Sequence, residues 1–190
     1  ELVVQAVQMG FAGLDTACQP KHYSEEGVGQ GLKTVEKNGI QRKALFLQTK
    51  FTSVGGQDPS RLPYDPHASL ATQVVQSFDS SRKNLGTHYV DSLVLHSPMK
   101  TLEETLVVWR AMEGIHHTGG AKLLGISNCY ELDVMRKLHQ NAEVKPSVLQ
   151  NRFCQDTGYD KNLRSWCQDK GIIYQSFWTL TANPHILRSQ

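Results

Sequence analysis

Four side chains of complementary chemistry, Asp15, Tyr23, Lys50 and His96, occur where apolar segments of this chain give way to polar ones. Asp15, Lys50 and His96 each end a short, mostly apolar run, and Tyr23 follows Asp15 in a polar stretch. A buried lysine ammonium beside a tyrosine hydroxyl favours the phenolate, so it is expected to lower the tyrosine pKa from about 10. A carboxylate next to the lysine would keep the ammonium charged and in place.

Such a tyrosine could act as a general acid–base near neutral pH, and a neighbouring histidine could orient a carbonyl oxygen through a hydrogen bond. Together these groups suit the protonation of a developing alkoxide, a reaction that needs a hydride donor, which no side chain provides. Each residue also has a simpler explanation. Asp15 could cap a helix or form a salt bridge, Lys50 could be a strand-end cation, His96 a core residue and Tyr23 an ordinary loop residue. Their occurrence together at successive strand ends favours a shared pocket.

The spacing of apolar residues predicts the elements that could bring these side chains together. It predicts six strands, over residues 14–17, 44–51, 90–96, 122–127, 147–150 and 172–177. It predicts helices between them, over 24–38, 68–85, 101–118, 131–141 and 160–169, after the end of a helix at 2–9. Apolar strands that alternate with helices are typical of a parallel sheet covered by helices.

The predicted fold class is therefore α/β, and a repeat of roughly 30 residues suits a doubly wound sheet or a (β/α)8 barrel of the TIM type. No GxGxxG opens a helix and no GxxxxGK[ST] occurs, which argues against Rossmann and P-loop proteins. In these folds the carboxyl ends of the strands meet at one face. Ser127 and Asn128 end the fourth predicted strand and Gln150 ends the fifth, so they are expected near the same pocket.

Composition narrows the function classes. A chain of 190 residues suits one domain, over residues 1–190, and its net charge of +2 does not favour a nucleic acid or anionic membrane partner. No apolar stretch approaches the roughly 20 residues of a membrane span, and the N-terminus does not resemble a signal peptide. The four cysteines form no CxxC pair, which is typical of free thiols in a cytoplasmic protein. The eight histidines show no metal-ligand spacing, so no metal is expected.

Several segments in this order resemble the aldo-keto reductase family over nearly the whole chain. They are Gly10-Phe11-Ala12-Gly13-Leu14-Asp15-Thr16-Ala17, Tyr23-Ser24-Glu25-Glu26-Gly27-Val28-Gly29, Gln48-Thr49-Lys50, Leu93-Val94-Leu95-His96-Ser97-Pro98 and Gly125-Ile126-Ser127-Asn128. The resemblance implies a (β/α)8 barrel that binds NADPH across its C-terminal face and reduces a small-molecule carbonyl substrate.

The resemblance also implies residue roles. Tyr23 would be the proton donor, Lys50 would tune it, Asp15 would pair with Lys50 and His96 would orient the carbonyl group. The residues expected to bind the nicotinamide end of the cofactor are Ser127, Asn128 and Gln150 at its carboxamide and Phe177 stacked on its ring.

The chain departs from the family pattern in three places. Tyr23 lies further from Asp15 than usual, so Cys18–His22 is interpreted as containing an insertion, and His22 is a weaker candidate for the proton donor. Trp178-Thr179-Leu180 replaces the usual small residues and proline after the last predicted strand. The resemblance begins after the first barrel strand and ends before the last, so the barrel is expected to be incomplete and to have two open edges.

Two hypotheses follow for the function. The first is an NADP(H)-dependent reductase of aldehydes or ketones. The second is a non-catalytic truncated product or a binding and regulatory protein on the same fold, as in potassium-channel β-subunits. A third and weaker hypothesis is an unrelated metal-dependent hydrolase or isomerase. The sequence leaves the carbonyl substrate, the preference for NADPH over NADH and the oligomeric state open. The segment 52–66 is either a plain surface loop or part of the substrate side.

Overall fold

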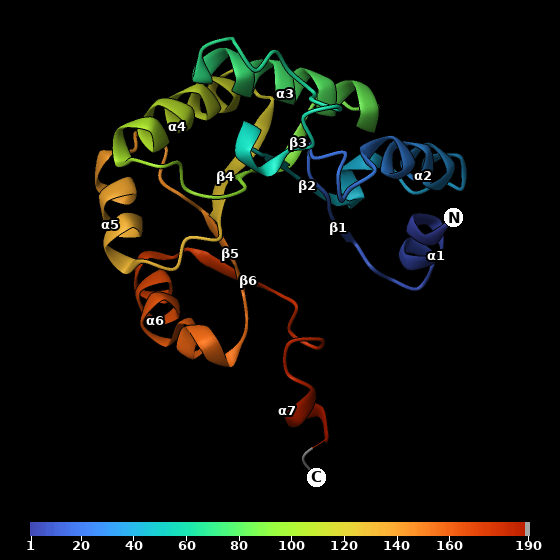
Figure 1. Ribbon diagram of the computed structural model, residues 1–190. Helices are drawn as coiled ribbons and strands as arrows, with labels where there is room; N and C mark the ends of the chain where they lie inside the picture. The colour runs from blue at the N-terminus through green and yellow to red at the C-terminus, as the bar shows by residue number, and fades with distance from the viewer. Residues whose placement is uncertain (189–190) are drawn as a thin grey trace.

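The computed structural model describes residues 1–188 and contains a single curled sheet of six parallel strands covered by helices (Figure 1). Neighbouring strands in the sheet are also neighbours along the chain, in the order β1-β2-β3-β4-β5-β6. The strands are β1 (Gly13–Asp15), β2 (Phe46–Phe51), β3 (Val90–Leu95), β4 (Ala121–Ser127), β5 (Val148–Arg152) and β6 (Ile173–Phe177). This sequential parallel order confirms the predicted α/β class and matches an incomplete (β/α)8 barrel rather than a doubly wound sheet.

The helices lie around the outside of the curled sheet, and α2 to α6 follow one another along its arc (Figure 1). The helices are α1 (Leu2–Gln8), α2 (Glu25–Lys37), α3 (Leu70–Leu85), α4 (Leu102–His117), α5 (Leu132–Asn141), α6 (Lys161–Lys170) and α7 (Pro184–Arg188). Short 3-10 turns occupy Arg42–Ala44, Val54–Gly56 and Gln155–Asp160. All except α7 and the 3-10 turns were predicted, with boundaries that differ by one or two residues.

Local chemistry explains where the long helices begin and end. The Ser24 hydroxyl accepts a hydrogen bond from the Gly27 N–H at the start of α2, and Thr101 accepts one from Glu104 at the start of α4. Gly86 ends α3 with φ of 66°, a left-handed conformation that glycine adopts without steric cost. These caps confirm the helix limits predicted at the same residues.

The hydrophobic core lies between the sheet and its helices. Trp109 and Met112 from α4 and Met135 and Leu138 from α5 are fully buried, as is Ile126 from β4. Burial of this apolar surface supplies the main driving force for folding. The core therefore holds the carboxyl ends of the strands in place, where the candidate site lies.

The two outer strands of the described chain leave the sheet open on both sides. β1 pairs only with β2, and β6 pairs only with β5, so the curled sheet has two open edges as expected (Figure 1). The predicted strand at 14–17 is observed at Gly13–Asp15. Within the predicted range Thr16 and Ala17 are buried, Leu14 is partly buried and Asp15 is exposed. Burial is therefore confirmed for most of this segment, and Asp15 is the exception. In residues 1–188 no helix is long and apolar enough to cross a membrane.

Candidate active site

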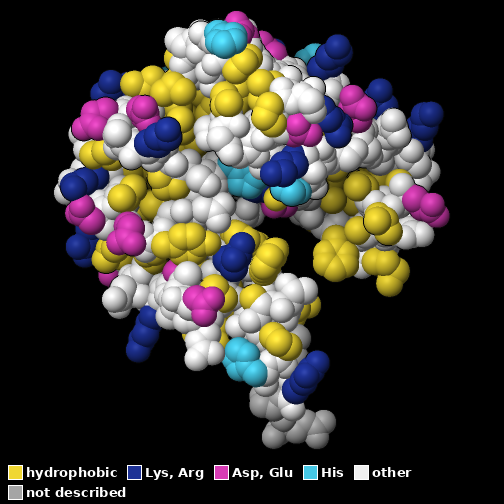
Figure 2. Space-filling model, viewed as in Figure 1, with side chains coloured by type: hydrophobic (Ala, Val, Ile, Leu, Met, Phe, Trp, Pro, Cys, Tyr) yellow, Lys and Arg dark blue, Asp and Glu magenta, His cyan; other side chains and the backbone are white. Residues whose placement is uncertain are grey.

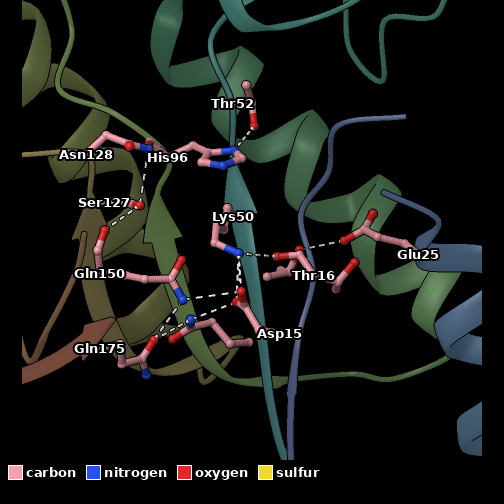
Figure 3. A network of polar contacts seen from close by, with 12 residues as sticks. Asp15, Thr16, Glu25, Lys50, Thr52, His96, Ser127, Asn128, Gln150 and Gln175 are labelled. Carbon is pink, nitrogen blue, oxygen red and sulfur yellow. Dashed lines mark hydrogen bonds and ion pairs between the residues drawn. The ribbon is translucent and has the colours of Figure 1, made fainter. Parts of the chain in front are cut away.

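Asp15 and Lys50 form an ion pair at the carboxyl ends of β1 and β2 (Figure 3). The Lys50 Nζ donates to both carboxylate oxygens of Asp15, at 2.7 and 2.8 Å, and to the Thr16 carbonyl oxygen at 2.9 Å. The Lys50 side chain is 1% exposed, whereas that of Asp15 is 44% exposed. Burial lowers the pKa of Lys50, and the Asp15 carboxylate opposes this effect. The predicted pairing of these residues is present.

Tyr23 lies above this ion pair, although its ionisation differs from the expectation. The Lys50 Nζ is 5.2 Å from the centre of the Tyr23 ring. Burial raises the pKa of Tyr23 above its ordinary value, and the nearby Asp15 carboxylate raises it further. The expectation of a lowered pKa was wrong because burial disfavours the phenolate and the Asp15 carboxylate repels it. The Tyr23 hydroxyl makes no hydrogen bond to another residue of the described chain, so its proton is available to a ligand.

The loop before Tyr23 is anchored by several hydrogen bonds. The Tyr23 N–H donates to the Gln19 carbonyl oxygen at 3.0 Å. The Gln19 amide in turn donates to the Gly56 carbonyl at 2.6 Å, and the Gln57 amide donates to the Cys18 carbonyl at 2.8 Å. The segment interpreted as an insertion is thus tied to the loop after β2, which places Tyr23 over Lys50. This placement supports the insertion, while His22 lies beside Tyr23 on the same cavity.

His96 follows β3 and is held as a neutral imidazole. Its ring centre lies 5.9 Å from that of Tyr23. Its Nδ1 lies 2.6 Å from the Thr52 hydroxyl oxygen (Figure 3). Burial lowers the pKa of His96 to about 4, and the Lys50 ammonium contributes to the shift. A neutral ring that accepts the Thr52 proton at Nδ1 carries its own proton at Nε2, where it could donate to a carbonyl oxygen.

Ser127 and Asn128, at the end of β4, make hydrogen bonds that brace the strand ends. The Ser127 hydroxyl donates to the Gln150 carbonyl oxygen at 2.6 Å. The Asn128 amide donates to the His96 carbonyl oxygen at 2.8 Å, and its own oxygen accepts from the Tyr130 hydroxyl at 3.2 Å. Asn128 has a φ of 52°, a left-handed conformation that asparagine tolerates. Both residues therefore lie at the expected site, and their polar atoms are already engaged in holding it.

Gln150 belongs to a group of three interior amides. Its Nε2 donates to Asp15 at 3.3 Å and to Gln175 at 3.0 Å (Figure 3). The Gln48 Nε2 donates to the same two residues, at 2.8 Å each. The sequence analysis missed Gln48, Gln175 and Thr52, because an uncharged polar residue inside a strand carries no signal of its own. The alternation of side chains along β2 and β6 could have placed both glutamines inside the barrel.

A cavity of about 620 Å³ unites these residues, and Figure 2 shows the surface hollowed inside the ring of helices. Seven of the eight predicted residues line the cavity, and Lys50 lies beneath it, bonded to Asp15. The volume falls within the usual range for small-molecule sites. The lining residues are Asp15, Gln19, His22, Tyr23, His96, Ser127, Asn128, Gln150, Arg152, Phe177 and Trp178.

A second, polar cavity of about 390 Å³ lies next to the first. Both cavities are lined by Gln19, His96 and Asn128, and the second adds Thr52 and Ser53 from the loop after β2. This contact supports the interpretation of the segment 52–66 as part of the substrate side. Within residues 1–188 no group of three or more histidine, cysteine, aspartate or glutamate residues is arranged to hold a metal ion.

Arg152 is a further residue that the sequence analysis missed. Its guanidinium lies 4.2 Å from the centre of a Trp178 ring and 5.9 Å from that of Phe177. It forms no ion pair with an acidic residue of the described chain. Trp178 has a φ of 57°, which is strained for a bulky residue. The strained turn therefore places an aromatic surface under a cation that is free to meet an anion.

Comparisons with known proteins bear on the family of this chain. A family model described as "Aldo/keto reductase family" matches residues 1–183. A glyoxal reductase of Bacillus subtilis is 31% identical over 177 residues, which cover 93% of this chain and 56% of that protein. A solved aldo/keto reductase from Brucella melitensis has a TM-score of 0.76 at 27% identity, covering 95% of this chain and 62% of that one.

A silkworm (Bombyx mori) aldo-keto reductase crystallised in complex with NADP has a TM-score of 0.74 at 27% identity, covering 93% of this chain and 54% of that one. The chain thus spans about half the length of the relatives it matches. Because the family model covers nearly all of its residues and the fold superposes on solved family members with a TM-score of up to 0.76, this chain belongs to the aldo/keto reductase family.

Proposed function

We propose that this chain carries the active site of an NADP(H)-dependent reductase of aldehydes or ketones. The observation that carries the proposal is the cavity in which Tyr23 and His96 face the same space above the Asp15–Lys50 ion pair. The name of the Bacillus subtilis relative, glyoxal reductase, and the NADP complex of the silkworm relative support the same chemistry.

The residues present fit the nicotinamide end of the cofactor. Phe177 and Gln150 line the cavity, and no described residue donates a hydrogen bond to the Gln150 amide oxygen. Phe177 would stack on the nicotinamide ring, and Gln150 would hold its carboxamide, with Ser127 and Asn128 bracing the strand ends. NADPH, when bound, supplies the hydride.

The side chains would divide the remaining work. His96, neutral at physiological pH, would donate from Nε2 to the carbonyl oxygen and orient it. Tyr23 would transfer its hydroxyl proton to the same oxygen as negative charge develops there. The Tyr23 hydroxyl is protonated at neutral pH, and its raised pKa makes it a weaker acid, so the transfer depends on the negative charge that develops on the carbonyl oxygen. The Lys50 ammonium, held by Asp15, would then stabilise the phenolate that remains.

A non-catalytic binding protein on the same fold is the second candidate. It is favoured by the 44% exposure of Asp15, which lies in an edge strand of the described chain. Water at the Asp15 carboxylate weakens the ion pair that the proposed chemistry uses.

Oxidation of NADPH in the presence of 4-nitrobenzaldehyde tests the proposal. We expect the purified chain to consume NADPH and the variant Tyr23→Phe to lose at least about 100-fold in turnover, the usual effect of a general acid. Tyr89→Phe is the matched control. Tyr89 precedes β3, at the opposite end of that strand from His96, and its ring contacts Arg42 and Lys122 at 4.5 Å each.

The outcomes separate the two candidates. Turnover that Tyr23→Phe removes and Tyr89→Phe retains supports the reductase. A folded chain that binds NADPH without consuming it, or turnover that is unchanged in Tyr23→Phe, contradicts the assigned role and favours the binding protein.

A further inference from the structure

Two glutamine side chains, Gln48 and Gln150, donate to the Asp15 carboxylate, and both also donate to a third glutamine, Gln175 (Figure 3). The Gln175 Oε1, from β6, accepts hydrogen bonds from Gln48 Nε2 at 2.8 Å and from Gln150 Nε2 at 3.0 Å. Each of these donors also reaches Asp15, through Oδ1 for Gln48 and Oδ2 for Gln150. Gln48 is 1% exposed and Gln150 is 7% exposed. The network therefore joins β1, β2, β5 and β6, with two buried glutamines between the half-buried Gln175 and the 44% exposed Asp15.

Gln175 and Asp15 together determine which end of the Gln150 amide faces inward, and Gln175 provides the shorter of the two hydrogen bonds. An amide group has two N–H donors on one side and an acceptor oxygen on the other. The Gln150 nitrogen points to Asp15 and Gln175, and its oxygen points away from them (Figure 3). Turning the amide over would bring the Gln150 oxygen against the Asp15 carboxylate and the Gln175 oxygen, with no proton between them. The network thus specifies one orientation.

Gln48 supports this orientation at a cost. Its Oε1 is buried without a hydrogen-bond partner among the described residues, and an unpartnered buried oxygen is unfavourable. Its two N–H donors are both used, on Asp15 and on Gln175. The position of Gln48 is therefore explained by its two donated hydrogen bonds. The bond to Gln175 holds the Gln175 oxygen where it can accept from Gln150.

We propose that Gln175, braced by Gln48, is a positioning residue that presents the Gln150 amide oxygen to the cavity as a hydrogen-bond acceptor. The cavity then selects a ligand with an N–H donor at that point, such as the carboxamide NH2 of nicotinamide. The identity of this ligand rests on the proposed function, whereas the orientation of Gln150 does not depend on it.

A pair of dinucleotides tests the selection. NADPH carries the carboxamide NH2, and the 3-acetylpyridine analogue of NADPH carries a methyl group in its place. We expect the wild-type chain to bind NADPH about tenfold more tightly than the analogue, the usual worth of one hydrogen bond. The Gln175→Met variant has no side-chain oxygen to accept a hydrogen bond, so its preference for NADPH over the analogue should fall from about tenfold to about twofold. Quenching of the protein fluorescence gives both dissociation constants without any turnover.

Two further variants show whether the loss of preference for NADPH is specific to Gln175. Gln175→Glu keeps an acceptor oxygen for both donors and should retain the preference for NADPH. Gln73→Met removes a buried glutamine outside the network, whose amide donates to the Pro66 and Ala68 carbonyls before α3. It should leave the preference unchanged. Equal loss in Gln73→Met, or full preference in Gln175→Met, would overturn the proposal.

Hydrogen exchange of the side-chain amides tests the positioning in the absence of any cofactor. In the ¹⁵N-labelled wild-type chain the Gln150 NH2 should exchange slowly. In Gln175→Met it should exchange at least about tenfold faster, because the Gln150 NH2 loses one of its two acceptors. Unchanged exchange would overturn the positioning role. Faster exchange in a chain that binds neither dinucleotide would uphold that role and contradict the proposed function instead. Gln175→Thr, with a shorter side chain, replaces Gln175→Met if that variant does not fold.

Discussion

Burial lowers the pKa of His96 to about 4, below its ordinary value near 6.5. Protons therefore bind the unfolded chain more readily than the folded one, and stability must fall as the pH drops through this interval. From pH 7 to pH 5 we expect the free energy of unfolding to decrease by about 2 kcal/mol through His96 alone. Urea denaturation at the two pH values measures this decrease.

His96→Asn provides the reference for this prediction, because asparagine does not titrate. The decrease between pH 7 and pH 5 should be smaller in the variant by about the same 2 kcal/mol. An equal decrease in both proteins would show that His96 binds protons in the folded chain. In that case its ring could not serve as the neutral donor that the proposed function requires.

Arg152 offers a second prediction at the residue scale. Its unpaired guanidinium, stacked on Trp178, is suited to a phosphate of the dinucleotide. In Arg152→Ala we expect the dissociation constant of NADPH to rise at least about tenfold, and by less at high salt. Arg136→Ala, on the exposed side of α5, is the control. Fluorescence quenching at two salt concentrations gives the comparison, and an unchanged constant in Arg152→Ala would exclude this role.

At the scale of elements, a close approach of α2 to α3 places the segment that follows Tyr23. A Cβ built on Gly29 would lie 2.1 Å from the Asn84 carbonyl oxygen, which is too short for any contact. Gly114, in α4, has no atom within 4 Å of such a Cβ. The two glycines both lie in helices and differ in the space around them, so they make a matched pair.

Gly29→Ala should therefore destabilise the chain by roughly 2 kcal/mol or more, because backbone has to move. Gly114→Ala should stabilise it by up to about 1 kcal/mol, because alanine favours the helix. Thermal denaturation of the two variants checks the signs. A stable Gly29→Ala variant would mean that α2 can shift away from α3.

The sequence predicts the elements of this fold well because its strands and helices differ clearly in apolar spacing. Caps at Ser24 and Thr101 and the glycine at Gly86 set the helix limits correctly. It does not predict the exposure of Asp15, because an apolar run around Leu14 looks the same in a central strand and in an edge strand. Which neighbour a strand lacks is a property of the sheet and not of its own residues.

The residues of the candidate site also differ in how far the sequence predicts their roles. Asp15 and Lys50 are predictable because charged residues at the ends of apolar strands need partners. Their effect on Tyr23 is not, because the direction of the pKa shift depends on where the ammonium lies relative to the ring and on how deeply the hydroxyl is buried. The alternation of side chains along β6 could place Gln175 inside the barrel, but its role appears only when the curled sheet brings β6 close to β5 and β1.

At the scale of the whole molecule, apolar side chains are exposed along both open edges of the sheet. Phe11, just before β1, is 66% exposed, and Ile173, in β6, is 56% exposed. Hydrophobic side chains gather over the α1 end of the molecule (Figure 2). The outer edges of β1 and β6 also present backbone groups that pair with no other strand of the described chain. Open edges of this kind promote association between chains.

We therefore expect the purified chain to self-associate through its edges. The double variant Phe11→Lys with Ile173→Lys should remain monomeric at concentrations where the wild type forms larger species, because association would bury an unpaired charge at each edge. Val75→Lys is the control, since Val75 is 46% exposed but lies on α3, away from both edges. Sedimentation velocity over a tenfold range of concentration gives the size distribution. A wild-type chain that stays monomeric over this range, or a double variant that associates as the wild type does, would show that the edges are protected in solution.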